Sequence, residues 1–527
     1  MSRCFVILLV VLGNIAISAD ITVPDEYSTI QGAIDAALDS DQVIVSSGTY
    51  NENINFKGKS ITVRSTNPDN PAVVAVTIID GSTPSDPNNA SVVTFNSGEN
   101  NDSILSGFTI TGGSGTWLTI GWDLHEIYWN RCGGGIVCYN LSEPTITKNI
   151  IRDNLAGEGG GIYVYGDPVN PASPSDPAVH ISPVIYENTL RDNSAIVVHG
   201  YDPPDDVYTL GNHGDGGAIV CFQGVDPQIT DNTIQNNHAD YYGGGIHLRQ
   251  WSNGLIENNN IIGNDSCLGA GVHVTYNSDP AVRGNTIQGN VAGGFGGGGI
   301  YVYYHSEPII EQNLITQNTS TNGAGIAVFW ESDAIIRNNL IVNNINGAGI
   351  RVKSESLVVI TNNTIVGNTA SQYFAGGIDC ITNAVVTIEN NIIASNGGAY
   401  GVYASSFLPT IGNNNIWGNG GANYSALIGD QTGINGNISE DPNFAGADDY
   451  HLMPISSCVD AGDSSFLPVS VTSDIDGESR IFGGQIDIGA DEVVLNSADF
   501  DRSGKVDLAD LANFVEQWLW QGGWYQQ

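Results

Sequence analysis

Residues 285–302 read NTIQGNVAGGFGGGGIYV and contain both motifs that decide the fold. One is Asn-x-Ile/Leu-x-x-Asn. The other is a small residue and Gly, followed by Ile or Val and a short alternating strand. The first motif recurs at Asn149–Asn154, Asn188–Asn193, Asn232–Asn237, Asn285–Asn290, Asn313–Asn318, Asn339–Asn344, Asn363–Asn368 and Asn391–Asn396. From Asn237 onward the closing Asn returns every 23 to 28 residues.

Each repeat unit holds only short strands and tight turns, without the helical stretch that a βαβ crossover needs. Units of this kind stack as coils of a parallel β-helix, so we expect an all-β solenoid. Gly and Asn suit the corners because they tolerate left-handed backbone angles, and stacked Asn side chains can satisfy buried turn amides. In these motifs the chain resembles the right-handed parallel β-helix repeat family with the pectin-lyase-like fold. The resemblance runs to about residue 440 and implies no single activity, because this fold hosts lyases, hydrolases, epimerases, adhesins and tail spikes.

The two ends of the chain suggest four segments. Arg3, the apolar run 5–12 and the small residues up to Ala19 predict a signal peptide over 1–19. The β-helix follows over 20–440, and Ile30, Ile34, Ala37 and Leu38 predict a helix that caps its first coil. Segment 441–495 resembles the tail that closes many bacterial secreted β-helix proteins. Residues 496–527 form the fourth segment.

The fourth segment contains a calcium-loop pattern. The predicted Ca²⁺ ligands are Asp499, Asp501, Ser503, Lys505 through its carbonyl, Asp507 and Asp510. Gly504 stands where such a loop turns sharply, and an apolar helix face follows. With Asp at the last position the segment resembles a type I dockerin repeat, which implies a cohesin-like partner. Dockerins carry two repeats and this chain shows one.

Composition narrows the function further. The chain of 527 residues has a net charge of -40 with only 16 Lys and Arg, which argues against nucleic-acid binding. No stretch after the signal peptide is long and apolar enough for a membrane span. We therefore expect a secreted or cell-surface protein. Six cysteines remain in the mature chain, and their pairing is left open.

Candidate site residues come from the Gly-Ile-x-Val strands, in which Ile and Val point inward and the residues between them outward. Coils stack ~4.8 Å apart, so outward side chains form columns that one extended ligand can touch. Long insertions at 113–131, 166–180 and 199–215 predict the walls of a groove beside these columns. The predicted substrate-binding residues are Tyr163, Trp251, Tyr303, Trp330, Arg351, Lys353 and Asp379. Aromatic faces suit sugar rings, and charged groups suit carboxylates or hydroxyls.

The predicted catalytic residues are His247, Arg249, His273 and Tyr301. By resemblance, a lyase of this fold would use such a base beside a uronate neutralised by Ca²⁺. A glycoside hydrolase would need two or three carboxylates facing one bond, and the sequence shows no such set. The other interpretation of the columns is a solvated sheet rich in strand-forming residues.

Two functional hypotheses follow. The first is a secreted, calcium-associated protein that binds an extended polysaccharide, with cleavage by a lyase or glycoside hydrolase reaction left open. The alternative is a non-catalytic cell-surface or adhesion protein, because the repeats also resemble those of polymorphic outer-membrane adhesins.

Overall fold

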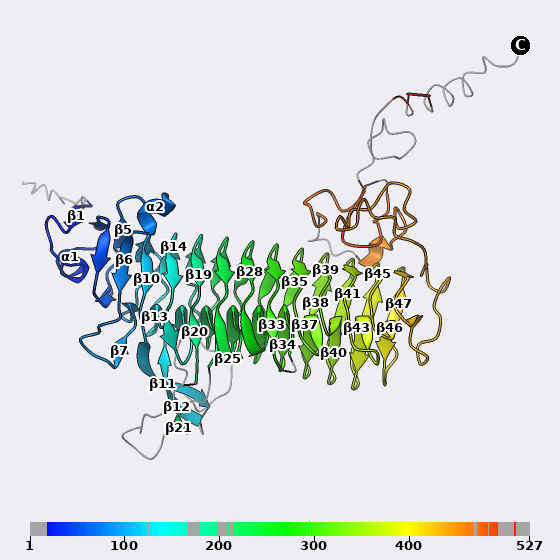
Figure 1. The fold of residues 1–527 in the computed structure, drawn as a ribbon, viewed down its shortest axis with the longest axis horizontal. Coiled ribbons are helices and arrows are strands. Elements are labelled where there is room, and N and C mark those ends of the chain that lie inside the picture. Colours follow the sequence, from blue (N-terminus) through cyan, green and yellow to red (C-terminus); the bar gives the residue numbers. More distant parts are fainter. Residues whose placement is uncertain are drawn as a thin grey trace, which may run out of the picture.

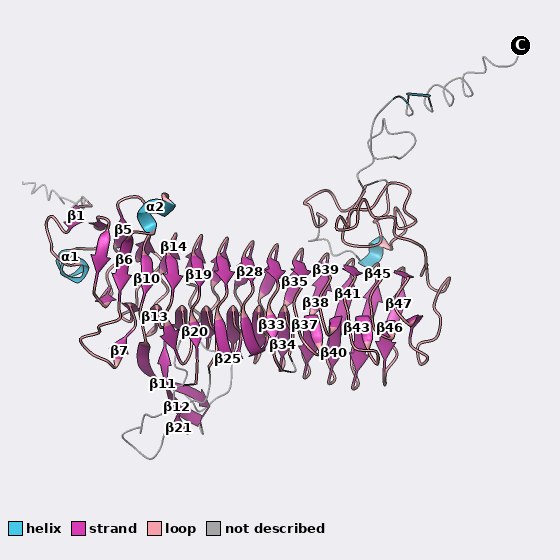
Figure 2. Cartoon of the chain, in the orientation of Figure 1, coloured by secondary structure: helices cyan, strands magenta, loops and turns pink. Residues whose placement is uncertain are grey.

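The protein is a parallel β-helix (Figure 1). The structure is a computed structural model that describes residues 18–123, 126–166, 179–197, 209–210, 214–294, 296–466, 472–482, 484–493, 508 and 511–512. Among the described residues, strands dominate and helices are few and short (Figure 2). None of those helices is long and apolar enough to cross a membrane. The predicted all-β solenoid is confirmed.

Three parallel sheets, here called A, B and C, form the sides of the solenoid. Sheet A contains β1 (Asp20–Val23), β2 (Gln42–Val45), β5 (Thr62–Ser65), β9 (Ile104–Ser106), β14 (Thr145–Thr147), β18 (Val184–Tyr186), β23 (Gln228–Thr230), β27 (Leu255–Glu257), β31 (Ala281–Arg283), β35 (Ile309–Glu311), β38 (Ile335–Arg337), β41 (Leu357–Thr361), β44 (Val385–Glu389) and β47 (Thr410–Gly412). Sheet B contains β3 (Gly48–Tyr50), β6 (Thr77–Asp80), β10 (Thr109–Thr111), β15 (Ile150–Arg152), β19 (Thr189–Arg191), β24 (Thr233–Gln235), β28 (Asn260–Ile262), β32 (Thr286–Gln288), β36 (Leu314–Thr316), β39 (Leu340–Val342), β42 (Thr364–Val366), β45 (Ile392–Ala394) and β48 (Asn415–Trp417). Sheet C contains β4 (Ile54–Asn55), β8 (Val93–Phe95), β13 (Ile136–Cys138), β17 (Ile162–Tyr165), β22 (Ile219–Phe222), β26 (Ile246–Arg249), β30 (Val272–Thr275), β34 (Ile300–Tyr303), β37 (Gly323–Phe329), β40 (Ala348–Lys353), β43 (Ala375–Ile381), β46 (Tyr400–Ala404) and β49 (Ala422–Tyr424).

Two smaller sheets lie outside the three-sided solenoid. A short parallel sheet contains β16 (Leu155–Ala156), β20 (Ser194–Ala195), β25 (His238–Tyr242), β29 (Asp265–Leu268) and β33 (Val291–Ala292). The other contains β7 (Asn89–Ala90), β11 (Gly115–Asp123), β12 (Glu126–Cys132) and β21 (Thr209–Leu210). Its antiparallel hairpin β11–β12 projects from the N-terminal half of the solenoid (Figure 1).

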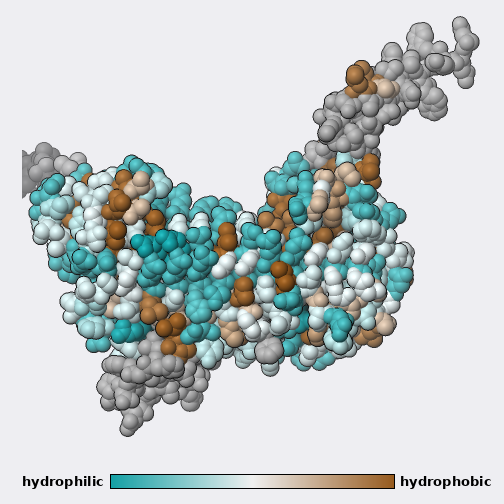
Figure 3. Space-filling view, in the orientation of Figure 1, coloured by the Kyte–Doolittle hydropathy of each residue, from teal (hydrophilic) through white to brown (hydrophobic). Residues whose placement is uncertain are grey.

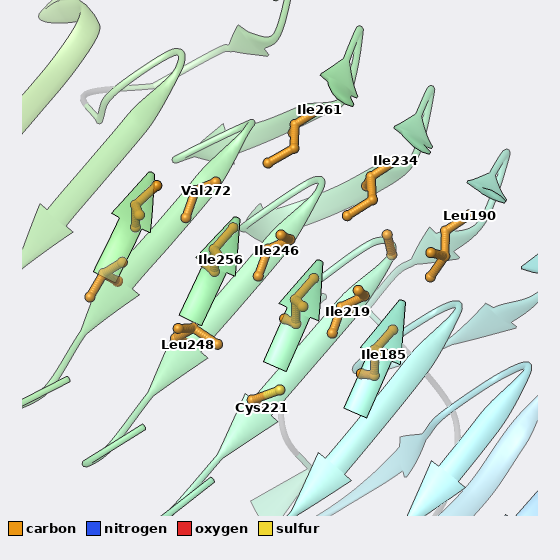
Figure 4. Packing of buried hydrophobic residues seen from close by; sticks show 14 of the residues in the cluster. Ile185, Leu190, Ile219, Cys221, Ile234, Ile246, Leu248, Ile256, Ile261 and Val272 are labelled. Carbon is orange, nitrogen blue, oxygen red and sulfur yellow. The ribbon is translucent and has the colours of Figure 1, made fainter. Parts of the chain in front are cut away.

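The interior is filled by aliphatic side chains that stack from coil to coil. In Figure 4, Ile185 and Ile256 enter from sheet A, Ile234 from sheet B, and Ile246 and Leu248 from sheet C. Burying such a side chain stabilises the fold by roughly 1.5–3 kcal/mol. The period-two alternation of the Gly-Ile-x-Val strands therefore does set which residues face the core, as predicted.

Two columns of buried asparagine run through the corners on either side of sheet B. One starts at Asn149 and the other at Asn154, and each continues with the Asn residues of the repeat. The Oδ1 atom of Asn318 accepts the main-chain N–H of Asn290 at 3.0 Å and its Nδ2–H at 2.9 Å. The Nδ2 of Asn318 donates to the carbonyl of Ile287 at 2.9 Å. Each side chain thus satisfies polar groups that the corners would otherwise bury without partners.

The first coil is covered by α1 (Ile30–Ala36), whose N-cap residue Thr29 accepts from the N–H of Gly32. Ile30, Ile34 and Ala37 are buried on the core, as expected of a capping helix, whereas Leu38 is 74% exposed. The prediction for Leu38 was wrong because the chain leaves the helix at Ala37, which has an extended backbone. A second helix, α2 (Pro71–Val74), lies near the same end and contacts β6 of sheet B (Figure 1).

Segment 441–493 packs on the outer face of sheet B near the C-terminal end. Leu452, Cys458 and Ile488 join Val342 and Ile392 in a separate apolar cluster. The 3₁₀ helix η1 (Ser464–Phe466) belongs to this segment. Figure 3 shows one face of the molecule hollowed between this segment and the α2 end. The six cysteines of the predicted mature chain are free thiols: Cys132, Cys138, Cys221, Cys267, Cys380 and Cys458.

Within this segment His451 lies among three carboxylates. Its Nδ1 contacts Asp449, and its Nε2 lies 2.8 Å from Oδ2 of Asp476. The hydrogen bond that the ring donates to Asp449, with the charges of Asp476 and Asp491, raises the pKa of His451 to about 9. The imidazole is therefore protonated at neutral pH.

We expect Asn318→Ala to destabilise the fold by about 3 kcal/mol, because it removes the acceptor of two buried donors and the donor to a buried carbonyl. The free energy of unfolding from urea denaturation measures this effect. Gln288→Ala is the control, since it removes only an exposed hydrogen bond to Gln317 and should change stability by less than about 0.5 kcal/mol. Equal losses in the two variants would contradict a special role for the asparagine columns.

The His451 contacts should stabilise the fold only while the imidazole is charged. Because the folded pKa lies above the ordinary value of 6.5, this contribution is complete below about pH 6.5 and fades as the pH rises through about 9. We expect His451→Gln to lower the Tm by roughly 1 °C near pH 6, because the contacts are partly exposed, and to have no measurable effect above about pH 10. Scanning calorimetry at both pH values tests this, and a Tm loss independent of pH would contradict it.

Candidate functional site

The predicted catalytic residues lie together on the outer side of sheet C. His247, His273 and Tyr301 occupy the same position on β26, β30 and β34. The rings of His247 and His273 stack with centroids 4.6 Å apart, and those of His273 and Tyr301 stack at 5.0 Å. Arg249 follows His247 by two residues and shares its face. The parallel register of the sheet thus assembles these side chains from separate coils.

These residues point outward from sheet C but do not reach solvent, so they do not line an open groove in this structure. His247, Arg249, His273 and Tyr301 are only 1–5% exposed. Tyr242, which precedes the Gly-rich part of its coil, folds back over sheet C against His247 and His273. Gly243 allows this turn with φ of +62°, and a Cβ there would lie 2.7 Å from Cβ of His247.

This pre-glycine column also brings two carboxylates onto the sheet. Cys132, Glu158, Asp215 and Tyr242 pair with one another in successive coils. Asp215 lies 3.3 Å from an Arg249 nitrogen through its Oδ2, and both side chains are buried. Glu158 accepts from Nδ2 of Asn130 at 3.2 Å. The sequence showed no carboxylate pair, yet the fold stacks Glu158 and Asp215 on neighbouring coils.

Burial shifts the pKa values of the titratable side chains on the outer side of sheet C. Desolvation, reinforced by the charge of Glu158 and opposed by Arg249, raises the pKa of Asp215 well above its ordinary value. Desolvation and Arg249 together lower the pKa of His273 to about 3, so its ring is neutral. Neither ring nitrogen of His273 has a hydrogen-bond partner among the described residues. Burial also raises the pKa of the Tyr301 hydroxyl.

Three of the predicted substrate-binding residues are buried on the same face. Tyr163 packs in an apolar cluster with Ile120 and Cys132. Arg351 donates from Nε to Oδ2 of Asp379 at 2.7 Å, and burial raises the pKa of Asp379 to about 6 against the opposing charge of Arg351. These groups are occupied by contacts within the protein.

The other four lie where sheet C turns toward sheet A. Trp251 and Tyr303 are half-buried there, Trp330 is 49% exposed, and Nζ of Lys353 lies 5.0 Å from the ring centroid of Phe329. This corner also presents Tyr276 and Tyr304, the latter 39% exposed.

We call Tyr276, Tyr303, Tyr304 and Trp330 the aromatic stripe. Ring centroids are 4.9 Å apart for Tyr276 and Tyr304 and 6.3 Å apart for Tyr303 and Trp330. The stripe crosses three successive coils, and Tyr303 also contacts Tyr301 of the buried layer at 5.6 Å.

A column of buried serines holds the stripe in register. The hydroxyl of Ser306 donates to the carbonyl of Tyr303 at 3.1 Å and accepts the N–H of Ser278 at 3.3 Å. Ser332 repeats this arrangement in the next coil with Phe329 and Ser306. Aromatic side chains that start beside this column therefore recur at the coil spacing.

The backbone of the stripe is strained. Tyr276, Tyr304 and Trp330 have φ of 57°, 56° and 59°, a left-handed region that costs a bulky residue roughly 1–2 kcal/mol. At the same corner position other coils use Asn140, Gln223, Gln250, Ser354 and Thr382. The fold accepts smaller residues there, so the aromatic rings serve something other than coil formation.

Two cavities open elsewhere, at the corner between sheets A and B beside α2. Their volumes are about 350 and 450 Å³, and both include Asp69 and Lys148 in their lining. The ammonium group of Lys148 contacts Asp69 and lies 3.6 Å from a Glu187 oxygen, so its charge is compensated. These two cavities therefore lie away from sheet C, beside which the groove was predicted.

Metal binding rests on two candidate sets. The predicted calcium ligands Asp499, Asp501, Ser503, Lys505, Asp507 and Asp510 lie outside the described residues, and the site stays a prediction. Donor atoms of His451, Asp476 and Asp491 lie within 4.8 Å of one another. Because His451 is protonated at neutral pH, we interpret this set as ion pairs.

Two local signals could have identified the residues that sequence reasoning missed. Glu158, Asp215 and Tyr242 each stand directly before a Gly-Gly pair. Tyr276 and Tyr304 each stand two residues before a serine of the corner column.

Comparisons with known proteins concern the fold. The family described as "Right handed beta helix region" matches residues 210–320 and 286–416. No curated protein sequence matches the chain. A solved complex of XylC with xylose is similar with 13% identity and a TM-score of 0.41, covering 90% of this chain and 98% of that one. The A-module of the mannuronan C-5 epimerase AlgE4 from Azotobacter vinelandii has 13% identity and a TM-score of 0.28, covering 79% and 94%. The matched family model and the three parallel sheets identify the fold as a right-handed parallel β-helix.

Proposed function

We propose that this protein binds an extended polysaccharide along the aromatic stripe, outside the cell. The observation that supports the proposal most strongly is the strained, exposed placement of Tyr304 and Trp330 where the fold accepts Asn, Ser or Thr. Flat aromatic faces pack against the apolar faces of sugar rings, and rings on successive coils offer several such contacts to one polymer. The predicted export segment 1–19 is consistent with a ligand of this kind.

Trp330→Asn and Tyr304→Asn separate binding from folding. Each variant should weaken binding of a recognised polysaccharide about tenfold. Neither should be less stable than the parent, because Asn relieves the strain of the left-handed backbone. Affinity electrophoresis in polysaccharide gels measures binding, and urea denaturation measures stability.

Tyr27→Ala is the matched control, since Tyr27 is also 39% exposed but lies beside the N-terminal cap. It should leave binding unchanged. A structural role for the stripe would show instead as lost stability with intact binding.

Cleavage of the bound polymer is the second candidate function. The buried pair of Glu158 and Asp215 favours it, with Arg249 beside Asp215 and Tyr301 linking the layer to the stripe. For chemistry on a polysaccharide, the Tyr242 side of this layer has to move so that a sugar can reach the carboxylates.

Assays for new reducing ends and for the absorbance of unsaturated ends test cleavage over a panel of glycans with Ca²⁺. If the protein cleaves, Asp215→Asn should abolish product while binding to the stripe remains. Trp330→Asn should instead lower product only through weaker binding, which raising the substrate concentration restores. Binding without product from any glycan would favour the non-catalytic surface or adhesion protein.

A further inference from the structure

A row of acidic residues runs beside the aromatic stripe. Asp279, Glu307 and Asp333 each follow an aromatic of the stripe by three residues, one per coil. The main-chain N–H of Glu307 donates to Oδ1 of Asp279 at 2.6 Å, and that of Asp279 donates to Oδ1 of Asn253 at 2.8 Å. This ladder holds the acidic row parallel to the stripe.

Further carboxylates stand inside that row. Glu331 follows Trp330 directly, and Glu355 takes the same position in the next coil. The side chain of Glu331 is 58% exposed, and Glu355 is exposed. A ligand on the stripe therefore meets negative charge along its length.

The nearby cations do little to offset this charge. Arg249 and Arg351 are buried and paired with Asp215 and Asp379. Lys353 lies over the ring of Phe329 at the end of the stripe. His305 has its Nδ1 3.9 Å from Glu331, so even when protonated its charge is shared with that carboxylate.

We infer that the stripe selects a glycan without carboxylate groups and excludes polyuronates. This inference rests on the proposed function and names its substrate class. A neutral sugar carries no charge for these carboxylates to repel. The carboxylates repel uronate groups, which every sugar of a polyuronate carries, so the repulsion grows with each coil that the polymer crosses.

Polymers matched in backbone but not in charge test the inference on the full chain. One pair is polygalacturonate and its fully methyl-esterified form, and the other is carboxymethylcellulose and hydroxyethylcellulose. Neutral β-glucans and mannans complete the panel. Affinity electrophoresis is run in EDTA, which removes divalent bridges between carboxylates, at about 0.02 M and about 0.5 M salt.

We expect at least one neutral polymer to retard the protein equally at both salt concentrations, and neither anionic polymer to retard it at low salt. The triple variant Glu307→Gln, Glu331→Gln and Glu355→Gln should keep its neutral ligand. It should also bind the anionic counterpart of that ligand at least tenfold more tightly than the parent does.

The possible results distinguish a failure of the charge inference from a failure of the proposed function. If the parent binds a polyuronate in EDTA, or if the triple variant excludes the anionic polymer as strongly as the parent, the inference on charge is wrong while binding at the stripe stands. If no polymer retards the parent, the proposed function itself fails.

Discussion

The hydrogen bond between asparagine side chains of successive coils is the interaction on which the rest of this molecule depends. In Asn290 and Asn318 one amide oxygen takes two donors from the coil before, and its own amide reaches back to a carbonyl of that coil. A corner built this way needs no water and admits only one spacing between coils. Side chains at equivalent positions consequently form straight columns, and every surface described above is such a column.

Because equivalent positions of successive coils form columns, a position where the chain departs from what folding alone favours can be identified by comparing coils. At the corner position of the stripe other coils use Asn140, Gln223, Gln250, Ser354 and Thr382, none of which carries a ring. Tyr276, Tyr304 and Trp330 replace them over three coils and place large rings at the surface. The left-handed backbone at this position costs a bulky aromatic residue more than a small one, and local strain of this kind is characteristic of sites under selection for function. The serine column beside the rings keeps this strained segment ordered.

Sequence reasoning predicted the solenoid, its interior and its first cap because these depend on a period that is visible in one chain. Alternation also placed His247, His273 and Tyr301 on one outer face of sheet C. It could not show that this face is covered, since a period of two says which side a residue takes but not what lies against it. The cover comes from Tyr242 and its equivalents, which turn back at glycines such as Gly243. Glu158 and Asp215 were missed for that reason, because their partners are remote in the sequence.

The aromatic stripe has a limited length as well as a regular spacing between its rings. At the next coils its corner position passes to Ser354 and then Thr382, and no ring continues the series there. The number of consecutive coils with an aromatic corner thus acts as a ruler for the length of polymer in contact. Duplication or loss of one coil would lengthen or shorten that footprint by one step without disturbing the cross-section. A solenoid can in this way change the reach of its binding surface in discrete increments, a route that a globular pocket does not have.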